Sequence, residues 1–216
     1  MACLIVAIVV YGFSFAIKDN LLFPSVPRPT VLYAHALVFA AWISVFLFQA
    51  SLVRSGQVRL HRRVGLAALF LGALVTILGV ATAFAMARFH AAQGDLSAVQ
   101  SLPVPLWDMV SFTSMFVLAA ALRKRPEHHR RLMLLATISL TAAAFGRMPA
   151  FDHAEWFYAG VDALILVAVA RDLVVDKRVH VVYRIGGPAI VAGQLLAAYT
   201  RWSHAWLSFS STIFGS

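Results

Sequence analysis

Seven long apolar segments, separated by short polar stretches, follow one another along the chain. An α-helix needs roughly 17–25 mostly apolar residues to cross the hydrocarbon core of a bilayer. Several breaks between the segments contain proline, as in FPSVPRP, SLPVP and RKRPE, and proline at the start of a helix costs no hydrogen bond. The pattern therefore predicts about seven transmembrane helices, over residues 2–17, 31–53, 62–86, 104–122, 130–148, 154–172 and 180–200.

The composition indicates that these helices lie in lipid. Of the 216 residues, 61% are hydrophobic and only 12% are charged, and the mean hydropathy is +0.82. Soluble domains are about 45–50% apolar and about 25% charged. One soluble core of this size cannot bury the excess. We therefore predict an all-α fold, a polytopic membrane helical bundle that forms a single integral membrane domain over residues 1–216.

The basic residues predict the orientation of the chain. Three alternate loops, 54–63, 123–131 and 171–184, carry thirteen of the eighteen lysines and arginines. Basic loops stay on the cytoplasmic side. The protein is thus expected in the inner membrane, with its N-terminus cytoplasmic and its C-terminus outside. Basic residues confined to such loops argue against nucleic acid as a partner. The single Cys3 excludes an internal disulfide and a multi-cysteine metal site.

A short motif occurs twice, 68 positions apart. RLHRRVG occupies residues 59–65 and EHHRRLM occupies residues 127–133. Each copy follows an apolar helix and a basic turn, and each leads into another apolar helix. This order predicts a duplicated two-hairpin core over 31–148. Residues 1–30 would then form the first helix and an outer loop, and residues 149–216 two further helices and a tail.

Two helices of the predicted core carry one-sided patterns. His35, Trp42 and Gln49 recur every seven residues, close to two helical turns, and therefore share a face. The next helix places a stripe of small side chains beneath His61, formed by Gly65, Ala68, Gly72, Thr76 and Gly79. Such a stripe allows helix backbones to approach closely. Alternatively, a flat cofactor lies against the stripe and an imidazole ligates its metal.

The inner histidines are the candidate ligands of such a cofactor. His61 and His129 begin helices that both enter from the cytoplasmic side, so they lie at similar depth, and His129 is directed into the bundle better than His128. Two neutral imidazoles can hold a heme iron. Arg62 and Arg130, with the arginine that follows each, would bind its propionates. In the other interpretation, the arginines are topology signals and the histidines are interfacial side chains.

A second polar set is predicted at the outer face. Asp162 lies about two turns inside the membrane, where an ionisable group is by default a functional hypothesis. A salt bridge or a hydrogen bond to a neighbouring helix would also explain it, and Arg147 would neutralise either Asp108 or Asp152. Histidine with carboxylates could bind a divalent metal or relay protons. The set comprises His35, Asp108, Arg147, Asp152, His153, Glu155 and Asp162.

The segments YAHALVFAAW and HRRVGLAALFLGALVTILG resemble the ascorbate-reducible transmembrane diheme cytochromes b. The resemblance implies that His35 and His61 are ligands from the first hairpin and that His129 is a ligand from the second. The fourth ligand is expected near the outer start of the fourth helix, where this chain has Asp108 and no histidine. His153 is the candidate substitute. The pattern also resembles uncharacterised bacterial membrane families without an assigned activity.

The leading functional hypothesis is transmembrane electron transfer through heme b, with the lipid bilayer and a redox partner as interaction partners. A non-catalytic membrane subunit or assembly factor, which packs against the helices of other subunits, is the alternative. A transporter or sensor that uses the outer histidine and acid cluster is a third. No nucleotide-binding loop, nucleophile elbow or catalytic triad is present in the sequence, so no catalytic residue is predicted.

Overall fold

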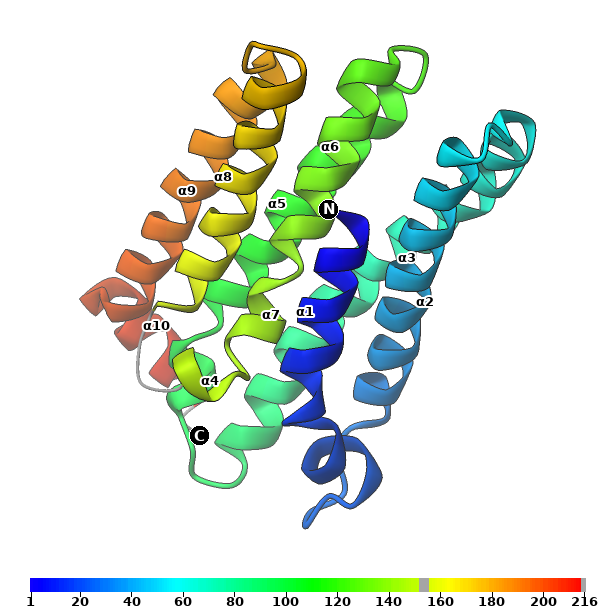
Figure 1. Cartoon of the computed structure of the whole chain (residues 1–216). Coiled ribbons are helices and arrows are strands. Elements are labelled where there is room, and N and C mark those ends of the chain that lie inside the picture. Colours follow the sequence, from blue (N-terminus) through cyan, green and yellow to red (C-terminus); the bar gives the residue numbers. More distant parts are fainter. Residues whose placement is uncertain (152–155, 215–216) are drawn as a thin grey trace.

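The computed structural model describes residues 1–151 and 156–214, and this part of the chain is helical throughout, without strands (Figure 1). The all-α prediction is confirmed for these residues, whereas Asp152, His153 and Glu155 lie outside them. The elements are α1 (Ala2–Ser14), a π-helix (Lys18–Leu22), α2 (Thr30–Arg54), α3 (Val58–Ala91), α4 (Ser97–Gln100), α5 (Pro103–Ala121), α6 (Pro126–Ser139), α7 (Ala142–Phe145), a 3-10 turn (Pro149–Phe151), α8 (Phe157–Val175), α9 (Val181–Trp202) and α10 (His204–Phe214).

Four stretches of helix in the described part of the chain are long and apolar enough to cross a membrane, and they make this a multi-pass helical membrane protein. They cover 30–54, 58–91, 97–121 and 181–202. Each of the seven predicted segments contains a helix in the described residues, but only 31–53, 62–86, 104–122 and 180–200 correspond to candidate spans. Helices α1 and α6 have only 13 and 14 residues, and α8 carries three charged residues. The turns after α2, α5 and α8, which hold the three basic loops, lie together at one end of the bundle (Figure 1).

The fifth predicted segment is broken where one continuous helix over 130–148 was expected. Three hydroxyl side chains there donate hydrogen bonds to carbonyls three or four residues earlier: Thr137 to Met133 O at 2.9 Å, Ser139 to Leu135 O at 3.0 Å and Thr141 to Ile138 O at 2.6 Å. Such back-bonding bends helices. The chain therefore leaves α6 after Ser139 and resumes as the short α7.

The two predicted hairpins are present and pack against each other. Helix α2 packs along α3, α5 along α6, and α3 along α5. Thr76 on α3 and Thr113 on α5 share a hydrogen bond of 2.9 Å. Trp42 on α2 is 1% exposed and meets the rings of Phe112 and Phe116 edge-on, with centroids at 5.1 and 5.6 Å. Helix α9 packs against α5 and α6, and α8 packs against α6 and α7. The duplication itself remains a prediction.

The stripe of small residues on α3 serves helix packing at its two deepest glycines. A Cβ atom at Gly72 would collide with the ring of Phe116, and one at Gly79 would collide with the sulfur of Met109. Both partners belong to α5. They occupy the surface against which a flat cofactor was the alternative expectation, so the packing interpretation holds at these positions.

We predict that Gly72→Leu destabilises the bundle, because the new side chain has no space beside Phe116. Overpacking of this kind costs about 1–3 kcal/mol. The measurement is the thermal unfolding midpoint of the detergent-purified protein. The control is Ala73→Leu, which adds similar volume at the exposed neighbouring position. Equal midpoints for the two variants would contradict the close α3–α5 contact.

Candidate functional site: a histidine pair at the inner end of the bundle

Two predicted ligand residues, His61 and His129, meet at the end of the bundle that carries the basic turns. His61 lies in the first turn of α3 and His129 in the first turn of α6. Their ring centroids are 6.4 Å apart and the ring planes are inclined by 75°. A metal held by two imidazole nitrogens on opposite sides, at about 2.0–2.1 Å from each, separates the ring centres by roughly 6 Å. The spacing therefore suits a shared ligand.

A hydrogen bond fixes the tautomer of His129. Its Nδ1 lies 2.9 Å from the carbonyl oxygen of Ala119, in the last turns of α5. A carbonyl only accepts, so Nδ1 carries the proton and donates. The neutral ring then keeps its lone pair on Nε2. A hydrogen bond of this kind, from the ring nitrogen that does not bind the metal, orients histidines that ligate metals.

The side-chain amide of Gln49 forms the corresponding hydrogen bond to Nδ1 of His61. In the orientation that satisfies both neighbours, the amide nitrogen donates to His61 Nδ1 and the amide oxygen accepts from the Gly65 N–H at 2.9 Å. An amide can also present its oxygen to a protonated Nδ1. In both hairpins, the histidine at the start of the second helix is thus held through Nδ1 by the end of the first helix.

Of the four arginines predicted to bind propionates, Arg131 is already paired with three carboxylates. Arg62 and Arg130 differ in their surroundings. Arg62 is exposed and has no ion pair within the described part of the chain. Arg130 is also exposed, but it already pairs with Glu127 at 2.7 Å and with Asp176 at 3.4 Å. Arg62 is therefore the better placed of the two for an anionic group beside His61.

Sequence reasoning missed a buried ion cluster centred on Arg131. Its side chain is only 4% exposed, and its guanidinium donates to both oxygens of Asp172, at 2.7 and 2.9 Å. It also donates to Asp176 at 2.6 Å and to Glu127 at 2.6 Å. The cluster joins the start of α6 to the inner end of α8. The sequence did offer a signal for this cluster, namely acidic residues in loops that are otherwise basic. Membrane orientation requires only lysine and arginine there, so the acidic residues needed another explanation.

The neighbouring His128 contacts His180 rather than His61. Its ring packs edge-on against His180, with centroids 4.6 Å apart. His180 caps α9, because its Nδ1 accepts from the Val182 N–H at 3.2 Å. Burial, followed by the nearby Arg131 charge, lowers the pKa of His180. The backbone N–H of His180 donates to Asp172 at 3.3 Å, so this residue anchors α9 to the cluster.

The outer polar set is dispersed. His35 packs on Phe39, with centroids 4.0 Å apart, and its buried Nδ1 has no hydrogen-bond partner in the described residues. Asp108 accepts from the Tyr158 hydroxyl at 3.0 Å. Arg147 lies over the Phe13 ring, 4.7 Å from its centroid, and makes no ion pair with Asp108.

One oxygen of Asp162, Oδ1, is buried without a hydrogen-bond partner in residues 1–151 and 156–214. Across those same residues, no group of three or more histidine, cysteine and acidic side chains is arranged to hold a metal ion. The divalent-metal alternative for the outer face therefore gains no support from the described residues.

No protein-family model, curated protein or solved structure matches this chain. The resemblance to the diheme cytochromes b therefore rests only on the two sequence segments that carry it. Function is inferred from the histidine pair itself.

We predict that Arg131→Met strongly destabilises the protein, because it leaves Asp172 buried without its cation. Breaking a buried pair by removing one partner costs about 3–5 kcal/mol. The matched control is Arg130→Gln, whose exposed ion pairs are worth about 1 kcal/mol or less. Chemical unfolding in detergent measures both. Equal, small losses would mean that the cluster does not hold α6 to α8.

Proposed function

We propose that the protein binds heme b between His61 and His129 and transfers electrons at the inner face of the membrane. The observation that carries this proposal is the ring separation of 6.4 Å across two different helices. The tautomer of His129 adds support, because its bond to Ala119 leaves Nε2 free to ligate. A bound heme would supply a one-electron ferric–ferrous couple.

The chain's own residues would position and tune that couple. The Ala119 carbonyl holds the His129 ring through Nδ1. The Gln49 amide nitrogen donates to Nδ1 of His61 in the orientation that also satisfies Gly65, so ligation by His61 through Nε2 would require the amide to turn over and accept from Nδ1–H instead. Arg62 is available to bind a propionate. The small Gly65, where only the Gln49 side chain comes near, leaves space on the bundle-facing side of α3.

The outer end of the bundle offers fewer ligands for a heme. His35 has no second imidazole near it among the described residues, and His153 lies outside them. The proposal therefore concerns one heme at the inner end. The partner-subunit and transporter hypotheses remain predictions, and a colourless purified protein would favour them.

The test is the dithionite-reduced minus oxidised absorption spectrum of the purified protein, with heme counted as its pyridine hemochrome. We expect a b-type spectrum and about one heme per chain, lost in His61→Ala and in His129→Ala. The control is His128→Ala, because that ring packs on His180 rather than on His61. A colourless protein from heme-replete cells, or a spectrum that survives both substitutions, would overturn the proposal.

We also predict that Gln49→Leu weakens heme retention without abolishing it. The substitution removes the partner of His61 Nδ1, and losing such a bond typically costs about 10–100-fold in metal affinity. Heme loss to an apo-myoglobin acceptor measures the effect. Ser44→Ala on the same helix is the control, since the Ser44 hydroxyl bonds only to its own helix at Ala40 O, 2.9 Å away. Equal loss rates would exclude a role for the amide.

A further inference from the structure

Helix α3 presents one continuous exposed face along its whole length. Leu66, Phe70 and Ile77 are 67%, 70% and 61% exposed. Arg59 and Arg63 precede them and Arg88 follows them, and all three arginines are exposed. The intervals between these six positions are three, four, seven and eleven residues, which keep them on one side of a helix. His61 points to the opposite side, toward His129.

The dimensions of this face match a lipid bilayer. The 24 residues between Arg63 and Arg88 include no charged side chain. At 1.5 Å per residue, these arginines are about 37 Å apart along the helix. The hydrocarbon core is about 30 Å thick, and arginine side chains extend toward the headgroups from either side. Acyl chains therefore cover the apolar part of the face.

The inner end of the face carries positive charge that the protein does not neutralise. The three basic loops at that end hold thirteen basic and three acidic side chains, a net charge of +10. All three acidic residues bind Arg131. Arg59 and Arg63 have no acidic partner in the part of the chain that the structure describes. Two such cations next to an exposed apolar surface suit an anion that is attached to an apolar chain.

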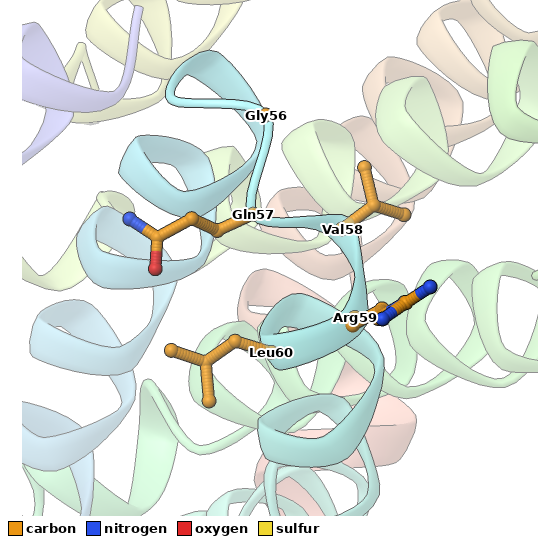
Figure 2. Close-up of a pocket in the computed structure, with 5 residues that line it drawn as sticks. All are labelled: Gly56, Gln57, Val58, Arg59 and Leu60. Atoms are coloured by element: carbon orange, nitrogen blue, oxygen red, sulfur yellow. The ribbon is translucent and has the colours of Figure 1, made fainter.

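A shallow depression adjoins this pair at the turn between α2 and α3. It has a volume of about 460 Å³ and is formed by Gly56, Gln57, Val58, Arg59 and Leu60. In Figure 2, Val58 and Arg59 project to one side of the turn and Gln57 and Leu60 to the other. Gly56 has a φ of +75°, which keeps the turn tight and without a side chain. The depression gives a headgroup space beside the Arg59 guanidinium.

We propose that this face is a binding site for an anionic phospholipid, with the phosphate held by Arg59 and Arg63 and an acyl chain along Leu66 and Phe70. Basic clusters at the cytoplasmic end of a membrane helix bind anionic headgroups, with about 1 kcal/mol from each basic residue. A zwitterionic lipid has the same phosphate, but its own cation offsets the attraction. The site does not depend on heme, because it lies on the other side of α3.

The test compares two lipids bound to the intact protein in detergent. Phosphatidylglycerol and phosphatidylcholine with identical acyl chains are titrated, and bound lipid is counted by native mass spectrometry. We expect phosphatidylglycerol to bind roughly 10-fold more tightly. That preference disappears in the double variant Arg59→Gln/Arg63→Gln. It persists in Arg123→Gln/Lys124→Gln, which removes the same charge from the turn after α5. Thermal midpoints verify that both variants fold.

Each alternative gives a distinct result. Equal binding of the two lipids, or an equal loss of preference in both double variants, would mean diffuse attraction to the basic end and would overturn the site. Competition by soluble glycerol phosphate at the concentration of the lipid would show that the anion alone is recognised, which also contradicts the proposal. Binding of a soluble acidic polypeptide in preference to phosphatidylglycerol, lost in Arg59→Gln/Arg63→Gln, would assign the face to a protein partner instead.

Discussion

The guanidinium of Arg131 determines how the inner end of the bundle is built. A buried cation must be neutralised where it lies, and Arg131 takes its carboxylates from α6, α8 and the turn after α8. The start of α6 is thereby fixed against α8, and with it His129, two residues earlier. Packing of Phe116 on Gly72 then sets α3 against α5 and brings His61 to its distance from His129. The histidine pair is thus a consequence of one ion cluster and one close helix contact.

The two His-Arg-Arg segments differ in what their arginines do. In both copies the histidine faces the interior and is held through Nδ1 by the preceding helix. The last arginine of the first copy, Arg63, is exposed on the side of α3 that faces away from His129. Its counterpart in the second copy, Arg131, is enclosed by three carboxylates because α8 covers that side of α6. The first hairpin therefore leaves its last arginine exposed, whereas the second uses the corresponding arginine to bind the rest of the protein.

Hydrophobic segments and loop charges predicted the helices and the grouping of the three basic turns, because both depend on local composition. The pairing of His61 with His129 was also predictable, since both histidines begin helices that run in the same direction. The break after α6 was not, because it results from three hydroxyl bonds that composition does not reveal. Nor was Asp172 as partner of Arg131, since that contact joins residues 41 positions apart. The stripe of small residues on α3 is compatible with both helix packing and cofactor binding. Only the structure shows that Phe116 and Met109 occupy it at Gly72 and Gly79.

In the proposed function, two imidazoles from different helices hold one iron at the end of the bundle that carries the basic turns. Low-temperature electron paramagnetic resonance of the oxidised, purified protein tests this arrangement most directly, because the spin state of ferric heme reports its axial ligands. We expect a low-spin signal, typical of two imidazole ligands, in the unaltered protein. Any heme that the His129→Ala variant retains should give a high-spin signal instead. A high-spin signal in the unaltered protein, or a low-spin signal unchanged by that substitution, would contradict it.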